Sequence, residues 1–331
     1  MKDVAIIEGQ IPTIMPEGPG VERKILGPGI SVKRFGTLSP THYSKVLNNV
    51  SAVISRPGAA FSREMILSMK KCQVIVSLGV GYDHICLNTA REMKIPVCNV
   101  RNYCTDEVAD TTIAMLLAHQ RKLFLYTQQK KWDWKIYIPI KRATQTQVGI
   151  IGYGNIGKAV TKRLKAFGYK IAIYDPFIQS NQIEPGFQKI DRLKELLSAS
   201  DIISVHSPLT NETAGLIDES FFSYLKSQAI VINTARGGIF KNIDLLYQAL
   251  KEHPELRIAT DAWPVEPPPP HPLLEAMEQN ELWLSDRLLI YPHTAFYSEN
   301  ALYDLRTFAA QIVKTVLEGG KPYNIINGIE A

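Results

Sequence analysis

The stretch VGIIGYGNIGKAV (residues 148–160) joins a run of apolar residues to a helical pattern through three closely spaced glycines. Residues 148–151 are mostly β-branched and apolar and predict a buried strand. Residues 155–167 place Ile156 and other apolar side chains on one helical face, and Gly168 follows where a left-handed glycine commonly ends a helix. The stretch therefore predicts a strand, a glycine turn and a helix.

The three glycines have the spacing G-x-G-x-x-G, which binds dinucleotides when it lies between a strand and a helix. Gly152 permits the tight turn, Gly154 lets a pyrophosphate approach the backbone, and Gly157 lets the helix pack closely on the strand. The next apolar run, KIAIYD, ends in Asp175, where a ribose-binding carboxylate belongs. Asp175 would repel the extra phosphate of NADP, and no arginine follows it directly, so the sequence favours NAD(H). A glycine turn in an ordinary α/β domain is the alternative.

The composition is that of a globular protein. A chain of 331 residues usually forms two domains, and the net charge of +5 is small, with lysines and arginines dispersed among acids. This distribution argues against a nucleic-acid partner. The chain begins with MKDVAIIEG, which resembles a strand more than a signal peptide, and no apolar run is long enough to span a membrane. We therefore expect a soluble, cytoplasmic protein with no membrane partner.

The metal-binding residue types show no ligand spacing. The four cysteines form no C-x-x-C pair, and the seven histidines form no H-E-x-x-H motif. Reduced, partly buried thiols and the absence of a catalytic metal are the expectation.

Strand-like runs alternate with helical segments along the chain, which predicts an α/β protein with parallel sheets. A long helix is predicted from Thr105 to about Gln129, and a final helix from Glu299 to Leu317, followed by two glycines. The strand-like runs are DVAIIEG, ISVKRFG, SAVISRP, QVIVSLG and IPVCNV before the glycine motif, and KIAIYD, DIISVHSPL, AIVINTARGG, RIATDAW and RLLIYPHTAF after it.

Polar residues follow the strands of the second half of the chain. Ligands of open parallel sheets lie outside the carboxyl ends of the strands, so these residues should meet at one crevice. They are Asp175, His206, residues 233–236, Asp261 and His293.

These motifs in combination resemble the D-isomer-specific 2-hydroxyacid dehydrogenases over nearly the whole chain. VGIIGYGNIG resembles the NAD fingerprint of that family, and VINTARGG resembles its turn with the substrate arginine. DAWPVEP resembles the loop with the catalytic glutamate, and PHTAF the loop with the catalytic histidine. The resemblance implies Arg236, Glu266 and His293 as catalytic residues.

Within the family, EVADTTIAMLLAHQRK, WDW and HTAFYSENA are most similar to the branch of the C-terminal binding proteins and their bacterial relatives. Two positions depart from that branch. Ser77 stands where those corepressors have an arginine, and Phe296 stands where they have a tryptophan. Phe296 with Tyr297 resembles D-lactate dehydrogenases instead, and GVGYDHI resembles glyoxylate and hydroxypyruvate reductases.

The resemblance also implies an architecture of two Rossmann-like or flavodoxin-like parallel-sheet domains. The NAD-binding domain, residues 103–295, would be inserted into a substrate-binding domain made of residues 1–102 and 296–331. Family members are usually homodimers, and the helix after Thr105 with Trp132 and Trp134 is the candidate dimer surface.

The expected chemistry is hydride transfer. Arg236 can clamp the carboxylate and carbonyl of a 2-oxo acid through its planar fork, and the N–H groups of Val80 and Gly81 would hold the other side of the carboxylate. His293 can protonate the carbonyl oxygen, and Glu266 would fix its tautomer and favour imidazolium. His206 would shape the cofactor pocket, and Phe296 would contact substrate. The remaining expected cofactor-binding residues are Asn155, Ile156, Thr234, Ala235 and Asp261.

We therefore expect an NAD-dependent D-2-hydroxyacid dehydrogenase acting reversibly on a small 2-oxo acid such as pyruvate, glyoxylate or hydroxypyruvate. An NAD(H)-sensing interaction protein resembling the corepressors is the alternative, although the chain lacks long disordered tails and has Ser77 at the arginine position. Formate or phosphite oxidation has no specific support in the sequence.

Overall fold

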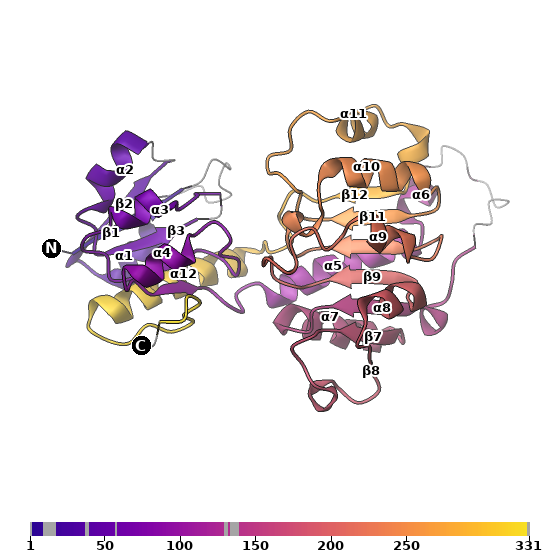
Figure 1. Ribbon diagram of the computed structural model, residues 1–331, viewed down its shortest axis with the longest axis horizontal. Coiled ribbons are helices and arrows are strands. Elements are labelled where there is room, and N and C mark those ends of the chain that lie inside the picture. The colour runs from indigo at the N-terminus through magenta and orange to yellow at the C-terminus, as the bar shows by residue number, and fades with distance from the viewer. Residues whose placement is uncertain are drawn as a thin grey trace. The chain divides into compact units, whose positions relative to one another are not determined.

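The computed structural model describes residues 2–8, 18–36, 40–56, 58–128, 132 and 139–329. The chain divides into two compact units, each built around a parallel sheet (Figure 1). Unit 1 comprises Met1–Cys104 and Ser298–Ala331, and unit 2 comprises Thr105–Tyr297. Within the ranges just given, no helix combines the length and the apolarity needed to cross a membrane.

Unit 1 contains a five-stranded sheet in the order β2-β1-β3-β4-β5, and all neighbouring strands are parallel. This order is that of flavodoxin-like folds. The strands are β1 (Lys2–Ile7), β2 (Ile30–Phe35), β3 (Ala52–Ser55), β4 (Ile75–Ser77) and β5 (Val97–Asn99). The helices are α1 (Gly20–Leu26), α2 (Pro40–Leu47), α3 (Arg63–Leu67), α4 (Leu87–Glu92) and α12 (Glu299–Leu317).

Successive residues of β1 face opposite sides of this sheet and enter two different cores. Val4 and Ile6 pack with Leu305 and Val313 of α12, whereas Ala5 and Ile7 pack with α2, α3 and α4. The helix predicted at 299–317 is confirmed, because Ser298 caps it through the Ala301 N–H and Gly319 follows it with a φ of +87°.

Unit 2 contains a seven-stranded sheet in the order β12-β11-β10-β9-β6-β7-β8, again parallel throughout. The order reverses between β6 and β9, which is the topological switch point of a Rossmann-like sheet. The strands are β6 (Gln147–Ile151), β7 (Lys170–Tyr174), β8 (Gln188–Lys189), β9 (Ile202–Val205), β10 (Ile230–Asn233), β11 (Arg257–Thr260) and β12 (Leu288–Ile290). The predicted class of two parallel-sheet α/β domains is therefore confirmed, although the short β8 was not predicted.

Helices cover both faces of the unit 2 sheet (Figure 1). α5 and α7 pack on one apolar face, and α8, α9 and α10 pack on the other. The bounds are α5 (Thr105–Gln120), α6 (Leu123–Thr127), α7 (Asn155–Ala166), α8 (Leu193–Ala199), α9 (Glu219–Ser223), α10 (Ile243–Glu252) and α11 (Pro272–Glu278).

The prediction of one helix from Thr105 to about Gln129 was wrong. α5 ends at Gln120, and Lys122 adopts a left-handed φ of +57° before α6 begins. At the break, the Lys122 amine lies 3.7 Å from the buried Asp286 carboxylate, a tertiary contact that the local sequence pattern does not reveal. Gln129 itself lies outside the described residues.

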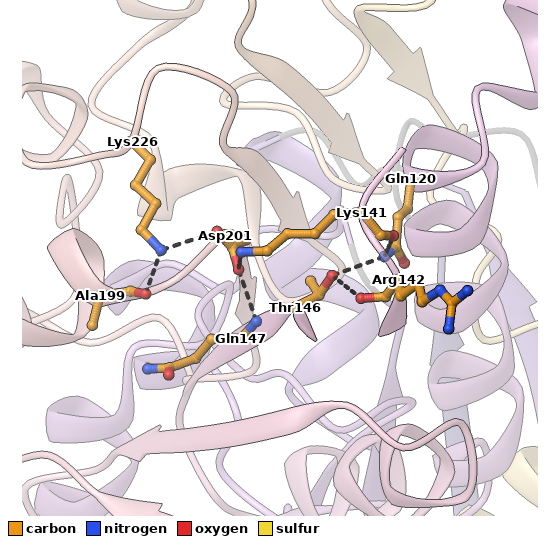
Figure 2. A network of polar contacts seen from close by, with 8 residues as sticks. All are labelled: Gln120, Lys141, Arg142, Thr146, Gln147, Ala199, Asp201 and Lys226. Atoms are coloured by element: carbon orange, nitrogen blue, oxygen red, sulfur yellow. Dashed lines mark hydrogen bonds and ion pairs between the residues drawn. The ribbon is translucent and has the colours of Figure 1, made fainter. Parts of the chain in front are cut away.

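A polar network ties the chain segment before β6 to the amino ends of β6 and β9 (Figure 2). The Asp201 carboxylate accepts the Gln147 N–H at 2.9 Å and the amines of Lys141 and Lys226 at 2.8 and 2.9 Å. Burial acts to raise the pKa of Asp201, but these donors hold it below its usual value. The network lies at the opposite edge of the sheet from the carboxyl ends of the strands.

Candidate functional site

The three glycines between β6 and α7 have different steric surroundings. Gly152 has a φ of +91°, and a Cβ there would lie 2.8 Å from the backbone of His206. A Cβ on Gly157 would lie 2.3 Å from the Gly152 carbonyl oxygen. At Gly154, by contrast, no described atom lies within 4 Å of the Cβ position. Two glycines are required by close packing, and the third leaves open space at the amino end of α7.

Asp175 directly follows β7 and lies beside this turn. One of its carboxylate oxygens accepts the Tyr153 N–H at 2.8 Å, and the other accepts the Phe177 N–H at 2.9 Å. The two bonds hold the carboxylate against the glycine turn, and each oxygen retains a further acceptor position. The arrangement suits the two neighbouring hydroxyls of a ribose.

His206 directly follows β9, the strand next to β6 in the sheet. Its Nε2 lies 2.8 Å from the Ser204 hydroxyl, and burial lowers the pKa of His206 to about 3. A histidine that does not protonate in the physiological range cannot act as an acid there. The role predicted for His206, shaping the cofactor pocket, stays a prediction.

The turn after β10 holds Arg236 through a buried asparagine. The Asn233 side chain accepts the Ala235 N–H at 3.0 Å and donates to the Arg236 carbonyl at 2.9 Å. Thr234 is tied to Thr112 of α5 by a hydroxyl contact of 2.9 Å. The sequence placed Asn233 at a strand end beside the expected crevice but gave it no specific role; an asparagine there commonly organises the following turn in this way.

Glu266 and His293 form a hydrogen-bonded pair. The Nδ1 atom of His293 lies 2.7 Å from one oxygen of Glu266, and the other oxygen accepts the Trp263 N–H at 2.8 Å. Burial is the largest influence and acts to raise the pKa of Glu266, but the hydrogen bond and charge of His293, the Trp263 N–H and the charge of Arg236 together hold it below its usual value. An ionised carboxylate only accepts, so Nδ1 carries the hydrogen. Nε2 has no partner among the described residues and is available for chemistry.

The loop that carries His293 is organised by Asp261. His293 has a left-handed φ of +51°, and its N–H donates to the Asp261 carbonyl at 2.8 Å. The buried Asp261 carboxylate accepts the N–H groups of Thr294 and Ala295 at 2.8 and 3.1 Å. Burial raises the pKa of Asp261. These contacts support the His293 loop, and the cofactor contact predicted for Asp261 stays a prediction.

Gly237 brings the Arg236 turn against the Glu266 loop. A Cβ on Gly237 would lie 1.6 Å from the Trp263 carbonyl oxygen, so the two backbones touch. The positive charge of Arg236 also contributes to the low pKa of Glu266. The carboxyl ends of β10, β11 and β12 therefore bring Arg236, Glu266 and His293 together within unit 2.

The other predicted residues lie as follows. Asn155 and Ile156 begin α7, and Phe296 is half-buried directly after the His293 loop. Val80 and Gly81 belong to unit 1, in the loop after β4, where the Val80 side chain is exposed. Of the two tryptophans, Trp132 is exposed and Trp134 lies outside the described residues.

The sequence is similar to known dehydrogenases. Residues 113–295 match the family model of the D-isomer specific 2-hydroxyacid dehydrogenase, NAD binding domain. A D-3-phosphoglycerate dehydrogenase of Methanocaldococcus jannaschii is 34% identical over 285 residues, covering 85% of this chain and 52% of that protein. One of Archaeoglobus fulgidus is 31% identical over 302 residues, covering 90% of this chain and 55% of that protein. The chain spans about half the length of these curated relatives.

A solved structure has a similar fold over nearly the whole chain. The crystal structure of a D-lactate dehydrogenase from Aquifex aeolicus, in complex with NAD and lactic acid, superimposes with a TM-score of 0.79 at 25% identity. The match covers 96% of each chain.

Proposed function

The chain belongs to the D-isomer specific 2-hydroxyacid dehydrogenase family, and from this premise we propose that it is an NAD-dependent dehydrogenase of a small 2-hydroxy acid. It would interconvert a 2-oxo acid, such as pyruvate, glyoxylate or hydroxypyruvate, and the corresponding D-2-hydroxy acid. The observation that carries the proposal is the Glu266–His293 pair beside Arg236, at the carboxyl ends of three strands of the NAD-binding domain.

Each residue has a definite task in this reaction. NADH, when bound, supplies the hydride to the carbonyl carbon. The imidazolium form of His293 donates a proton from Nε2 to the carbonyl oxygen. Glu266 stabilises that imidazolium form before the transfer. Arg236 binds the carboxylate and carbonyl of the substrate through its planar fork. In the direction of oxidation, neutral His293 accepts the proton instead.

A substrate panel tests the proposal. NADH oxidation should be followed with pyruvate, glyoxylate, hydroxypyruvate, phenylpyruvate and branched 2-oxo acids. The 2-oxo form of 3-phosphoglycerate belongs in the panel because two relatives are named for that substrate. We expect at least one acid to turn over at roughly 1 to 1,000 per second. Tight NADH binding with negligible turnover of every acid would contradict the proposal.

The corepressor alternative receives no support from the relatives named above. Both curated relatives carry the name of a dehydrogenase, and the predicted position close to the C-terminal binding proteins is not confirmed. The family is therefore established and the branch is not.

Asp175 should decide the choice between NADH and NADPH. We expect Asp175→Ala to weaken NADH binding and to narrow its advantage over NADPH, because the carboxylate that accepts ribose hydroxyls and repels a phosphate is removed. Dissociation constants for both cofactors, measured by NADH and NADPH fluorescence, check this. Asp191→Ala, which removes an exposed aspartate from the same unit, is the control and should change neither constant. Equal binding of both cofactors by the wild-type protein would contradict the role of Asp175.

We also propose a homodimer in the cytoplasm. Exposed apolar side chains support a partner surface: Leu123 and Tyr126 of α6 are 52% and 37% exposed, and Trp132 is 84% exposed.

A further inference from the structure

Three buried polar side chains form a row at the carboxyl edge of the unit 1 sheet. Ser55, Ser77 and Asn99 end β3, β4 and β5, and they are neighbours in register across the three strands. Their exposed fractions are 0%, 0% and 3%. Polar groups buried at this depth are costly unless they are hydrogen-bonded. All three side chains bond to the same loop, residues 79–84.

Three consecutive carbonyl groups of that loop are held at the sheet edge, one by a backbone N–H and two by side chains of the row. The Val100 N–H donates to the Gly79 carbonyl at 3.0 Å. The Asn99 side-chain amide donates to the Val80 carbonyl, and the Ser77 hydroxyl donates to the Gly81 carbonyl, both at 2.7 Å. Ser55 contributes at the far end of the loop, where its hydroxyl lies 3.0 Å from Nε2 of His84. The three carbonyls therefore face the sheet edge.

Peptide planarity fixes the direction of the N–H groups that follow these carbonyls. In a trans peptide the C=O and the next N–H point in opposite directions. The N–H groups of Val80, Gly81 and Tyr82 therefore point away from the sheet edge, and no residue in the described part of the chain accepts a hydrogen bond from them. Successive backbone N–H groups that face one side form an anion-binding concavity.

The orientation of the Asn99 amide follows from its second contact. The Arg101 guanidinium donates to the side-chain oxygen of Asn99 at 3.1 Å. An arginine can only donate, so the nitrogen of the Asn99 amide must be the atom that faces Val80. An aspartate at this position would keep the contact with Arg101 but would place two acceptors against each other at Val80.

We propose that Ser77 and Asn99 are positioning residues, which aim the N–H groups of Val80, Gly81 and Tyr82 at the carboxylate of the substrate. The inference rests on the proposed function, because it takes the anion to be the carboxylate of a 2-oxo acid. It adds a third donor, Tyr82, to the two predicted from the sequence. It also assigns a task to Ser77. The sequence analysis noted this residue only because the corepressors have an arginine at its position.

Two variants test the inference, because loss of carboxylate binding should change KM and leave kcat nearly unchanged. Ser77→Ala and Asn99→Asp should each raise the KM of the best 2-oxo acid about tenfold, with kcat and NADH affinity little changed, because binding of the carboxylate is lost equally in the ground and transition states. Steady-state kinetics at saturating NADH measure this.

Matched controls separate positioning from stability. Ser68→Ala removes a hydroxyl that donates to the Met65 carbonyl at 2.6 Å, and Asn327→Asp alters a buried amide that donates to the Ile95 carbonyl at 2.9 Å. Both lie in unit 1 and contact no part of the 79–84 loop among the described residues. Each removes or alters a hydrogen bond of unit 1 as the test variants do, and each should leave KM unchanged. Test variants with the same KM as these controls would overturn the inference.

Amide hydrogen exchange, followed by NMR on the wild-type protein with NADH, tests the concavity without turnover. Oxalate carries carboxylates but no reducible carbonyl, and it should slow exchange at Val80, Gly81 and Tyr82. Unchanged exchange at all three would also overturn the inference. A wild-type protein that turns over no acid but shows this protection would contradict the proposed function alone.

Discussion

His293→Gln should lower kcat for reduction of the best 2-oxo acid by about a hundredfold to ten-thousandfold, the usual contribution of a general acid. Glutamine can donate a hydrogen bond to the carbonyl oxygen but cannot transfer a proton to it. NADH affinity should stay close to the wild-type value, because the described contacts of the His293 side chain are with Glu266 and not with the glycine turn. Steady-state kinetics and NADH fluorescence measure the two quantities.

A second variant, Glu266→Gln, tests whether His293 acts together with Glu266. Glu266→Gln removes the charge that favours the protonated ring, so the alkaline limb of the pH profile for reduction should move to lower pH. The acid limb for oxidation should move in the same direction, since oxidation needs the neutral ring. Adding Glu266→Gln to His293→Gln should cost little more, because residues that act as a unit are not additive. Glu219→Gln, at an exposed glutamate of unit 2, should move neither limb. Stationary limbs in Glu266→Gln would exclude the pair as the proton-transfer unit.

Arg236→Lys should lower kcat/KM at least tenfold, which corresponds to roughly 1.4 kcal/mol. The substitution keeps the charge but loses the planar fork that makes two parallel hydrogen bonds to a 2-oxo acid. Because Asn233 holds the turn through backbone atoms of Ala235 and Arg236, the turn itself should persist in the variant.

The matched control is Arg192→Lys, at an exposed arginine of the same unit, which should leave kcat/KM unchanged. NADH affinity should be the same in both variants. A wild-type kcat/KM in Arg236→Lys would remove Arg236 from the substrate site, whatever the outcome at His293.

The local pattern of apolar residues, caps and glycines was sufficient to predict much of the fold. The β-branched runs predicted the main strands, and the helices at 155–166 and 299–317 begin and end close to the predicted residues, because caps and glycines act within one turn of the chain. The requirement for glycine at residues 152 and 157 was also predicted, and the structure shows the close contacts behind it. The break at Lys122 was missed; the residue that its amine contacts there, Asp286, lies far along the chain and is outside the reach of a local pattern.

The sequence by itself determined the class of the fold, the nucleotide motif and the residue types that could perform the chemistry, because these depend on short-range periodicity and on the chemistry of single side chains. Only the tertiary structure decided which polar groups meet. Parallel pairing of β11 with β12 allows Glu266 to reach His293, and the register of β3, β4 and β5 aligns Ser55, Ser77 and Asn99 beneath one loop. Such contacts join residues that are distant in the chain, so they depend on strand order and register, which local sequence does not encode.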